Sequence, residues 1–415
     1  MNMSASPQTR LRTIAVASGK GGVGKTVLTA NLAVSLAGGA SGTKASVIAA
    51  DLDLGCGNLN ACLGVRRPQG SIDAYLRRRV GSLAEVLTPT EQENLRMICT
   101  SYSGAPEMQL AEGTKLRLQH EIRHLEADYV LMDLGAGTSA DVLDFFLAAD
   151  ERIVVITPES LSLHNAFVFL KTAVLRFLRR ESLKKGFPPQ VKTAWEELTK
   201  DPERLNVRGM IDQLKKRDRW AAYLLTGLLG DFKIRFVVNM YREAAETSHL
   251  KNFHQLLNRY LCLTAHAGYL GMVHFDHGVR RAVQEMKPFL LAYPESRAAQ
   301  EISQVAQSLS SRLEWDVLAP LHLAMGTHDP ADQEAPEQPF PRPALVHFPG
   351  LASLSAEEGE AVPAASRVGV SGAGEGGAPS GEIPRVASRI DEDAARGAGR
   401  DILQVAERLA TNPSS

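Results

Sequence analysis

The stretch TIAVASGKGGVGKT, Thr13–Thr26, decides the fold of this chain. It begins with a short apolar run, Ile14–Ala17, which is typical of a buried strand. A glycine-rich loop follows, and its spacing from Gly19 onward matches G-x-x-x-x-G-K-[ST], the phosphate-binding loop. The pattern after the loop predicts a helix over residues 24–36, closed by two glycines. A strand, a glycine loop and a helix in this order are the context that the motif requires.

Each position of this loop has a chemical reason. Glycines lack a Cβ atom, so the backbone can curl and bring its N–H groups close to phosphate oxygens. The Lys25 ammonium is expected to reach the β- and γ-phosphates of a nucleotide, and the Thr26 hydroxyl to bind Mg²⁺. The N-terminus of the helix adds a field that favours anions. The residues predicted to hold the nucleotide here are Gly21, Gly22, Val23, Gly24, Lys25 and Thr26.

The composition is that of a soluble globular protein. The 415 residues permit one large α/β domain with an addition, or two domains, and 46 basic against 47 acidic residues give no global field that favours nucleic acid. Four cysteines without a C-x-x-C pair indicate a reducing compartment and argue against an iron–sulfur or other metal site built on cysteines. No apolar run approaches the roughly 20 residues needed to span a bilayer, and no signal peptide is visible. We therefore expect a cytoplasmic protein.

Two further apolar runs end in carboxylates. A strand predicted over 45–50 delivers Asp51 and Asp53, and a strand over 129–132 ends at Asp133. Carboxylates at the C-terminal edge of a parallel sheet lie where such sheets bind ligands. Asp133 follows the Walker-B arrangement, in which a buried strand holds a carboxylate near the water shell of the metal. Asp51 is expected to hold Mg²⁺ through water.

The remaining elements follow from hydrophobic periodicity. Apolar and amphipathic runs alternate along the chain, which favours an open, mostly parallel, doubly wound sheet with right-handed crossovers. Residues 68–94 are predicted to be a surface excursion with a short helix. Strands are predicted at 95–100, 152–156 and 233–238, and helices at 72–79, 115–125, 159–179 and 295–313.

A second lysine, Lys20, makes the loop K-G-G-x-G-K-T, and in this form the chain resembles the MinD/ParA superfamily of dimerising ATPases. The resemblance implies that Lys20 reaches across a dimer interface to the nucleotide of the partner. It also implies that Asp53, in a D-x-D-x-G segment, positions the attacking water, and that Asn239 at a strand end hydrogen-bonds adenine. Lys20, Asp53 and Asp133 are thus the predicted catalytic residues.

Two later segments of the chain resemble one branch of this superfamily in particular. DLGAGTSADVLDFFLAAD at 133–150 and IVVITPESLSLHNAFVFLK at 153–171 are similar to the FlhG (FleN) branch, which regulates flagellar number and placement. The match spans roughly residues 11–180 and, less closely, 233–310. His274 departs from the family segment I-P-x-D-x-x-V, in which proline is usual, so the stiffness of that loop is in question.

We predict a P-loop domain over 11–313 with a helical insertion at 181–231. Residues 314–415 are rich in Pro, Gly, Ala and Glu, so they are predicted to be mostly disordered. A short helix at 401–410 has a small apolar face and is predicted to be at best a weak membrane anchor.

The function implied by the resemblance is an ATP-dependent switch. ATP and Mg²⁺ complete a homodimer, hydrolysis to ADP and phosphate releases it, and the output is the placement or number of flagella or of another polar or division structure. A protein partner of unknown identity is expected, with weak peripheral contact at the membrane or cell pole and no nucleic acid. The predicted Mg²⁺ residues are Thr26, Asp51 and Asp133.

Three alternatives remain open from the sequence. A ParA-like partition ATPase would act on DNA, and the near-neutral net charge weighs against it. A P-loop cofactor-assembly enzyme similar to the iron–sulfur carrier Mrp is disfavoured by the lack of C-x-x-C. A non-hydrolysing ATP-binding scaffold is disfavoured because Asp53 and Asp133 are both present.

Overall fold

The computed structural model describes residues 11–39, 42, 44–55, 57–100, 110–182, 189–199, 206–242, 247–263 and 267–310. These residues belong to one compact unit, Met1–Thr327. The predicted tail 314–415 and its short helix at 401–410 lie outside the described residues.

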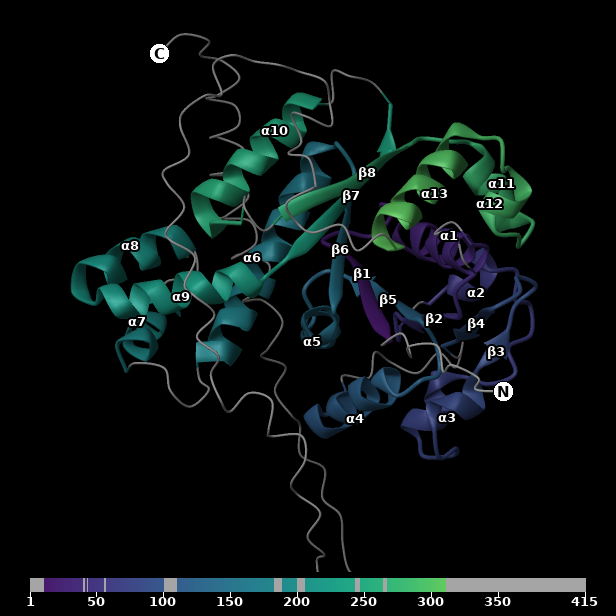
Figure 1. The fold of residues 1–415 in the computed structure, drawn as a ribbon, viewed down its shortest axis with the longest axis horizontal. Helices are drawn as coiled ribbons and strands as arrows, with labels where there is room; N and C mark the ends of the chain where they lie inside the picture. The colour runs from purple at the N-terminus through teal and green to yellow at the C-terminus, as the bar shows by residue number, and fades with distance from the viewer. Residues whose placement is uncertain are drawn as a thin grey trace, which may run out of the picture. The chain divides into compact units, whose positions relative to one another are not determined.

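A single sheet forms the centre of the described chain (Figure 1), with strands in the order β3-β4-β2-β5-β1-β6-β7-β8. Every neighbouring pair is parallel except β3 and β4, which are antiparallel. The predicted open, mostly parallel sheet is therefore confirmed. The strands are β1 (Arg12–Ser18), β2 (Val47–Leu52), β3 (Thr88–Pro89), β4 (Leu95–Ile98), β5 (Tyr129–Ala136), β6 (Glu151–Ile156), β7 (Ile234–Tyr241) and β8 (Ala267–His274).

Burial on both faces explains why the central strands are continuous apolar runs. In β1 the side chains of Ile14–Ala17 are all fully buried. Ile14 and Val16 belong to the core on one face of the sheet, while Ala15 and Ala17 belong to the core on the other. Alternate side chains of β1 therefore pack into the cores on the two opposite faces of the sheet.

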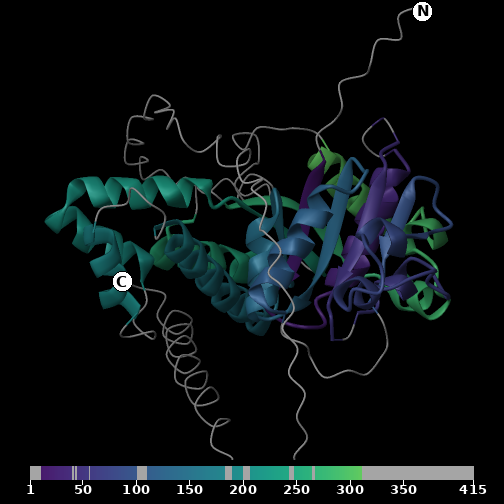
Figure 2. The same ribbon diagram turned by 90° about the horizontal axis from the view of Figure 1, so that it is seen from below.

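Helices cover the two faces unequally (Figure 2). The core on one face packs under a smaller group of helices: α1 (Lys25–Ala37), α2 (Leu59–Cys62), α11 (Gly278–Gln284), α12 (Phe289–Ala292) and α13 (Arg297–Ser310). The core on the other face packs under α3 (Ile72–Leu76), α4 (Glu112–Arg123), α5 (Ala140–Ala148), α6 (Ser160–Ser182), α7 (Pro189–Thr199), α8 (Val207–Arg217), α9 (Arg219–Asp231) and α10 (Thr247–Leu256), followed by a short π-helix, η3 (Leu257–Leu261).

Residues 68–94 and strand β8 are among the parts of the fold that differ from the sequence predictions. Residues 68–94 are not only a surface excursion, because Ile72 of α3 and both Leu83 and Val86 of a 3-10 helix, η1 (Leu83–Val86), are buried. Strand β8 was not predicted: its two glycines and half-buried positions weaken the apolar pattern. The helical character predicted for 181–231 agrees with α7, α8 and α9.

Helix α6 corrects the statement that no run is apolar enough to span a bilayer. By length and composition alone, its 23 residues meet the requirement for a membrane-crossing helix. In the structure 56% of its most apolar window is buried, the arrangement expected of a core helix.

Candidate functional site

The phosphate loop connects β1 to α1 with a backbone that only glycine permits at its last turn. Gly24 caps α1 with a left-handed φ of 85°, and a Cβ atom there would lie 2.3 Å from Asn239 Nδ2. No side chain caps the start of α1. The first amide groups of the helix therefore remain available for an anion.

Lys25 and Asp133 form a buried ion pair across the site. Lys25 Nζ lies 2.8 Å from Asp133 Oδ1, and both side chains are almost fully buried. Thr29, one helical turn after Lys25, hydrogen-bonds to the Lys25 carbonyl at 2.9 Å and to Asp133 Oδ1 at 3.4 Å. Asp133 Oδ2 is buried without a hydrogen-bond partner among the described residues.

Asp51 lies beside Asp133 because β2 and β5 pair in parallel with these two residues in register. Burial, followed by the charge of Asp133, raises the pKa of Asp51 to about 7. Burial also raises the pKa of Asp133, against the opposing effects of Lys25 and Thr26. A further cation beside these two neighbouring carboxylates would favour their ionised forms.

The loop after β2 closes tightly on Asp51. Its carboxylate accepts the backbone N–H groups of Asp53 and Leu59, each at 3.2 Å. At Gly57 a Cβ atom would lie 2.3 Å from Asp51 Oδ2. Neither Gly57 nor Thr29 is among the site residues predicted from the sequence. The i, i+4 spacing of Thr29 from Lys25 on one helix is the signal that could have found Thr29.

The other predicted residues surround this centre. Asp53 is half-buried, and a Cβ atom at Gly135 would lie 3.5 Å from Asp53 Oδ1, so the carboxylate faces the C-terminal end of β5. Asn239 Nδ2 donates to the Val23 carbonyl at 2.8 Å. Lys20 is half-buried, and its carbonyl accepts the Ser18 hydroxyl at 2.9 Å.

His274, predicted to stand where proline is usual in the family segment, makes two contacts with α13. Its backbone N–H donates to Glu301 Oε2 at 2.8 Å, a bond that proline lacks, and its Nδ1 lies 2.7 Å from Glu301 Oε1. Arg297 binds the same carboxylate at 2.9 Å. The C-terminal end of β8 is therefore held by side chains of α13.

The residues present fit a hard divalent cation bound together with phosphate. Mg²⁺ prefers one or two carboxylates with phosphate and water oxygens. The unpartnered Asp133 Oδ2, the neighbouring Asp51 and the Thr26 hydroxyl are oxygen donors of this kind. Within the described ranges, no group of three or more His, Cys, Asp and Glu side chains could hold a metal on its own.

Comparisons with known proteins identify the family of the chain. The family model for the CobQ/CobB/MinD/ParA nucleotide binding domain matches residues 14–289. The antiactivator FleN of Pseudomonas aeruginosa is 24% identical over 304 residues, which cover 72% of this chain and 87% of FleN.

Two Helicobacter pylori proteins match a shorter stretch. The septum site-determining protein MinD is 32% identical over 154 residues, and the flagellum site-determining protein YlxH is 32% identical over 161 residues. These stretches cover 37% and 38% of this chain, and about half of each relative, 55% of MinD and 52% of YlxH. A solved structure of Pyrococcus furiosus MinD aligns with a TM-score of 0.48 at 20% identity, covering 72% of this chain and 98% of that one.

The family model spans more than half of the chain, from β1 to the start of α12. The chain therefore belongs to the CobQ/CobB/MinD/ParA nucleotide-binding family. The resemblance predicted from the phosphate loop is confirmed, and the FleN and YlxH matches support its flagellar branch.

Proposed function

We propose that this member of the nucleotide-binding family is an ATP-dependent switch, which binds ATP with Mg²⁺, dimerises in that state and hydrolyses ATP to ADP and phosphate. The observation that carries the proposal is the buried Lys25–Asp133 ion pair, joining the phosphate loop to β5 at 2.8 Å. A nucleotide phosphate would recruit Lys25, and Asp133 would then need another cation. Nucleotide binding is thereby linked to the loop that follows Asp133.

The roles of the residues follow from their positions. Lys25 places its charge on the β- and γ-phosphates, and the amides at the start of α1 bind phosphate oxygens. Thr26, Asp51 and Asp133 would hold Mg²⁺, which when bound neutralises phosphate charge. Asp53 orients the attacking water from the edge of the site. Asn239, next to the loop backbone, takes the adenine.

An exposed apolar face beside the loop supports the dimer. The first three turns of α6, Ser160–Leu170, carry no Asp, Glu, Lys or Arg, yet Leu161 is 57% and Val168 is 38% exposed. A Cβ atom at Gly19 would lie 2.1 Å from the Asn165 carbonyl oxygen, so this part of α6 packs directly on the loop. Protein interfaces are depleted of charge at their core. A second copy that covers this face would bring its own Lys20 to the nucleotide.

The cellular output that we propose is the placement or number of flagella, or of another polar or division structure. Support comes from FleN, whose alignment covers most of both chains, and from YlxH, described as a flagellum site-determining protein. The chain would act in the cytoplasm with a protein partner, and meet the membrane or cell pole peripherally.

The test compares the wild-type chain with Asp53→Ala. We expect the wild-type protein to be monomeric with ADP, dimeric with ATP and Mg²⁺, and to release phosphate. Asp53→Ala should bind ATP and accumulate as the dimer, because Asp53 serves the attacking water rather than ground-state binding. Light scattering after size exclusion and a phosphate-release assay measure both. A wild-type chain that stays monomeric with ATP, or an Asp53→Ala chain with full turnover, contradicts the proposal.

A further inference from the structure

A second charged surface lies away from the phosphate loop, where α8 turns into α9. Residues 215–220, KKRDRW, form this turn, here named the α8–α9 tip. Its four cations are exposed, and Trp220 is 60% exposed. The one acid of the tip, Asp218, uses its carboxylate to cap α9, accepting the N–H groups of Trp220 and Ala221 at 3.0 Å.

The fold forces these side chains outward. The apolar face of α8, which includes Met210, Ile211 and Leu214, is buried against the core. The lysines and arginines on the other face therefore project into solvent. The Trp220 ring stacks on Tyr223 with centroids 5.5 Å apart and an interplanar angle of 20°. The tip is thus a rigid support for cations and one indole.

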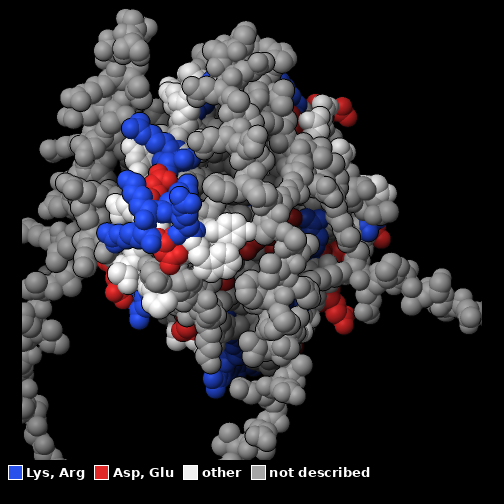
Figure 3. All heavy atoms as spheres, turned by 60° about the vertical axis from the view of Figure 1, so that its left-hand side comes forward, with Lys and Arg blue, Asp and Glu red and all other residues white. Residues whose placement is uncertain are grey.

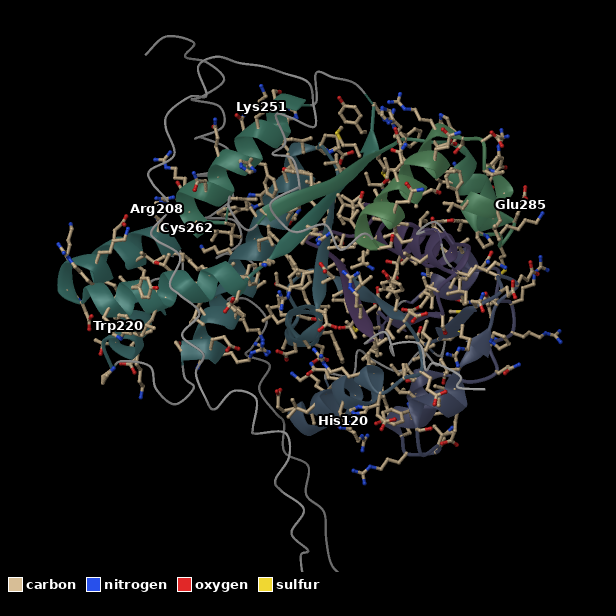
Figure 4. The ribbon with its side chains drawn as sticks, in the orientation of Figure 1. His120, Arg208, Trp220, Lys251, Cys262 and Glu285 are labelled. Atoms are coloured by element: carbon tan, nitrogen blue, oxygen red, sulfur yellow. The ribbon has the colours of Figure 1, made fainter. Side chains whose placement is uncertain are left out.

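The basic surface continues from the tip along α8. Arg208 lies at the start of α8, and its Nη2 donates to Asn258 Oδ1 at 3.0 Å. The residue after Asn258 is a further cation, Arg259. Figure 3 brings this side of the molecule forward and shows Lys and Arg gathered on it. Figure 4 places Arg208 and Trp220 on the α8 and α9 helices, on the far side of α6 from α1.

The net charge of the whole chain does not show how charge is divided between residues 1–310 and the rest. Residues 1–310 carry 38 basic and 31 acidic side chains, whereas residues 311–415 carry 8 and 16. The net charge of −1 for the whole chain is therefore no measure of the field around the described helices. A positive part of a molecule attracts anionic surfaces over about one Debye length.

We propose that the α8–α9 tip is a contact site for an anionic phospholipid surface. Its cations pair with headgroup phosphates while Trp220 enters the interfacial region, where amphipathic aromatic rings are favoured. The tip ends a helical hairpin, so it presents these groups outward to a planar surface. This site belongs to the described helices rather than to the C-terminal segment, and it shares no residue with the nucleotide site.

Vesicle binding tests the proposal on the full chain. We expect co-sedimentation with vesicles of equal parts phosphatidylglycerol and phosphatidylcholine, none with phosphatidylcholine alone, and a decrease as salt rises. Each cation near an anionic surface contributes about a factor of five to binding. Lys215→Glu/Lys216→Glu should therefore lower the affinity more than tenfold.

A matched control separates the tip from overall charge. Arg66→Glu/Arg67→Glu makes the same change in net charge on another exposed loop and leaves the tip unaltered. It should therefore bind vesicles like the wild-type chain. Equal losses in the two charge-reversal variants would overturn the proposal, as would the absence of binding by the wild-type chain.

The indole supplies a direct readout. The chain has three tryptophans, so Trp195→Phe/Trp315→Phe leaves Trp220 as the only one. Its emission should shift to shorter wavelength with anionic vesicles and be quenched by brominated lipid. An unchanged spectrum in the presence of bound vesicles would contradict the role of Trp220. Binding of duplex DNA in the same buffer without binding of vesicles would assign the tip to nucleic acid instead.

Discussion

At the scale of single residues, the site is a balance of buried charges. One buried ammonium, that of Lys25, faces two buried carboxylates, those of Asp51 and Asp133, which neighbour each other across β2 and β5. Removing one partner of a buried pair is costly because the other keeps its charge in a medium that solvates it poorly. The two carboxylates outnumber the one ammonium, and Mg²⁺ bound beside them would supply the additional positive charge.

The substitution Lys25→Ala should abolish nucleotide binding, because it removes the charge held on the phosphates. It should also lower the stability of the nucleotide-free protein by up to about 3–5 kcal/mol, since Asp133 loses its only ion-pair partner among the described side chains. Isothermal titration with ATP and Mg²⁺, together with urea unfolding, measures both effects. Lys44→Ala, at an exposed ion pair with Glu93, is the control and should change neither. Wild-type ATP affinity in Lys25→Ala would refute the phosphate-loop assignment.

Asp51 gives the nucleotide-free protein a dependence of stability on pH. Its pKa is raised to about 7 in the folded state, against a usual value of 3.8. As pH rises from 3.8 to 7 the unfolded chain loses this proton while the folded chain keeps it, so stability falls, and the loss is complete above pH 7. A pKa shift of this size changes the free energy of unfolding by at most about 4 kcal/mol.

The substitution Asp51→Asn removes this titration. We expect it to stabilise the nucleotide-free protein at pH 8 and to have little effect near pH 4, with denaturant midpoints at the two pH values as the measurement. Glu91→Gln, on an exposed loop, serves as the control. A stabilisation that is equal at both pH values would show that the side-chain charge is not its cause.

At the scale of elements, the sequence predicted those helices and strands whose residues form a recognisable local pattern. Apolar runs that end in a carboxylate located β2 and β5, and the glycine loop located the start of α1 to within a residue. The contact between Lys25 and Asp133 joins residues 108 positions apart. It depends on strand order, which no local pattern contains. The same holds for the raised pKa of Asp51, which arises from burial and from a neighbour on another strand.

Helix α6 shows the limit of a periodicity argument. Its pattern predicts a long helix correctly, but it cannot tell that the apolar residues of the first turns include two exposed ones, Leu161 and Val168. Only the packing of Gly19 against Asn165 places that face beside the phosphate loop. The sequence pattern predicts helix α6, whereas the proposed dimer interface is inferred from the contact between Gly19 and Asn165.

We expect Leu161→Glu/Val168→Glu to keep ATP affinity and to lose ATP-dependent dimerisation, because charges in a dry interface are unfavourable. Light scattering with ATP and Mg²⁺ measures the mass. Leu116→Glu is the matched control, since Leu116 of α4 is 58% exposed and outside α6. Dimers formed normally by the α6 variant would show that this face is not the one buried between copies.

At the scale of the whole molecule, two copies are proposed to share each active centre. Lys20 lies in the loop but makes no ion pair with a described residue. We expect Lys20→Ala to bind nucleotide normally and to lose dimerisation and turnover. Mixed with Lys25→Ala, it should form heterodimers in which only the Lys20→Ala chain holds ATP and the other chain supplies Lys20. Recovery of phosphate release in the mixture is the expected result, and wild-type dimerisation by Lys20→Ala alone would contradict a role in trans.

One margin of the sheet has a consequence for how such a protein can be concentrated in a cell. Strand β3 has only two residues, pairs antiparallel with β4, and ends in Pro89, which has no N–H to offer. A new strand cannot be added there as it could along a long, regular edge, so fibril growth from this side is blocked. Copies that gather at one location in the cell would therefore not join through the β3 edge.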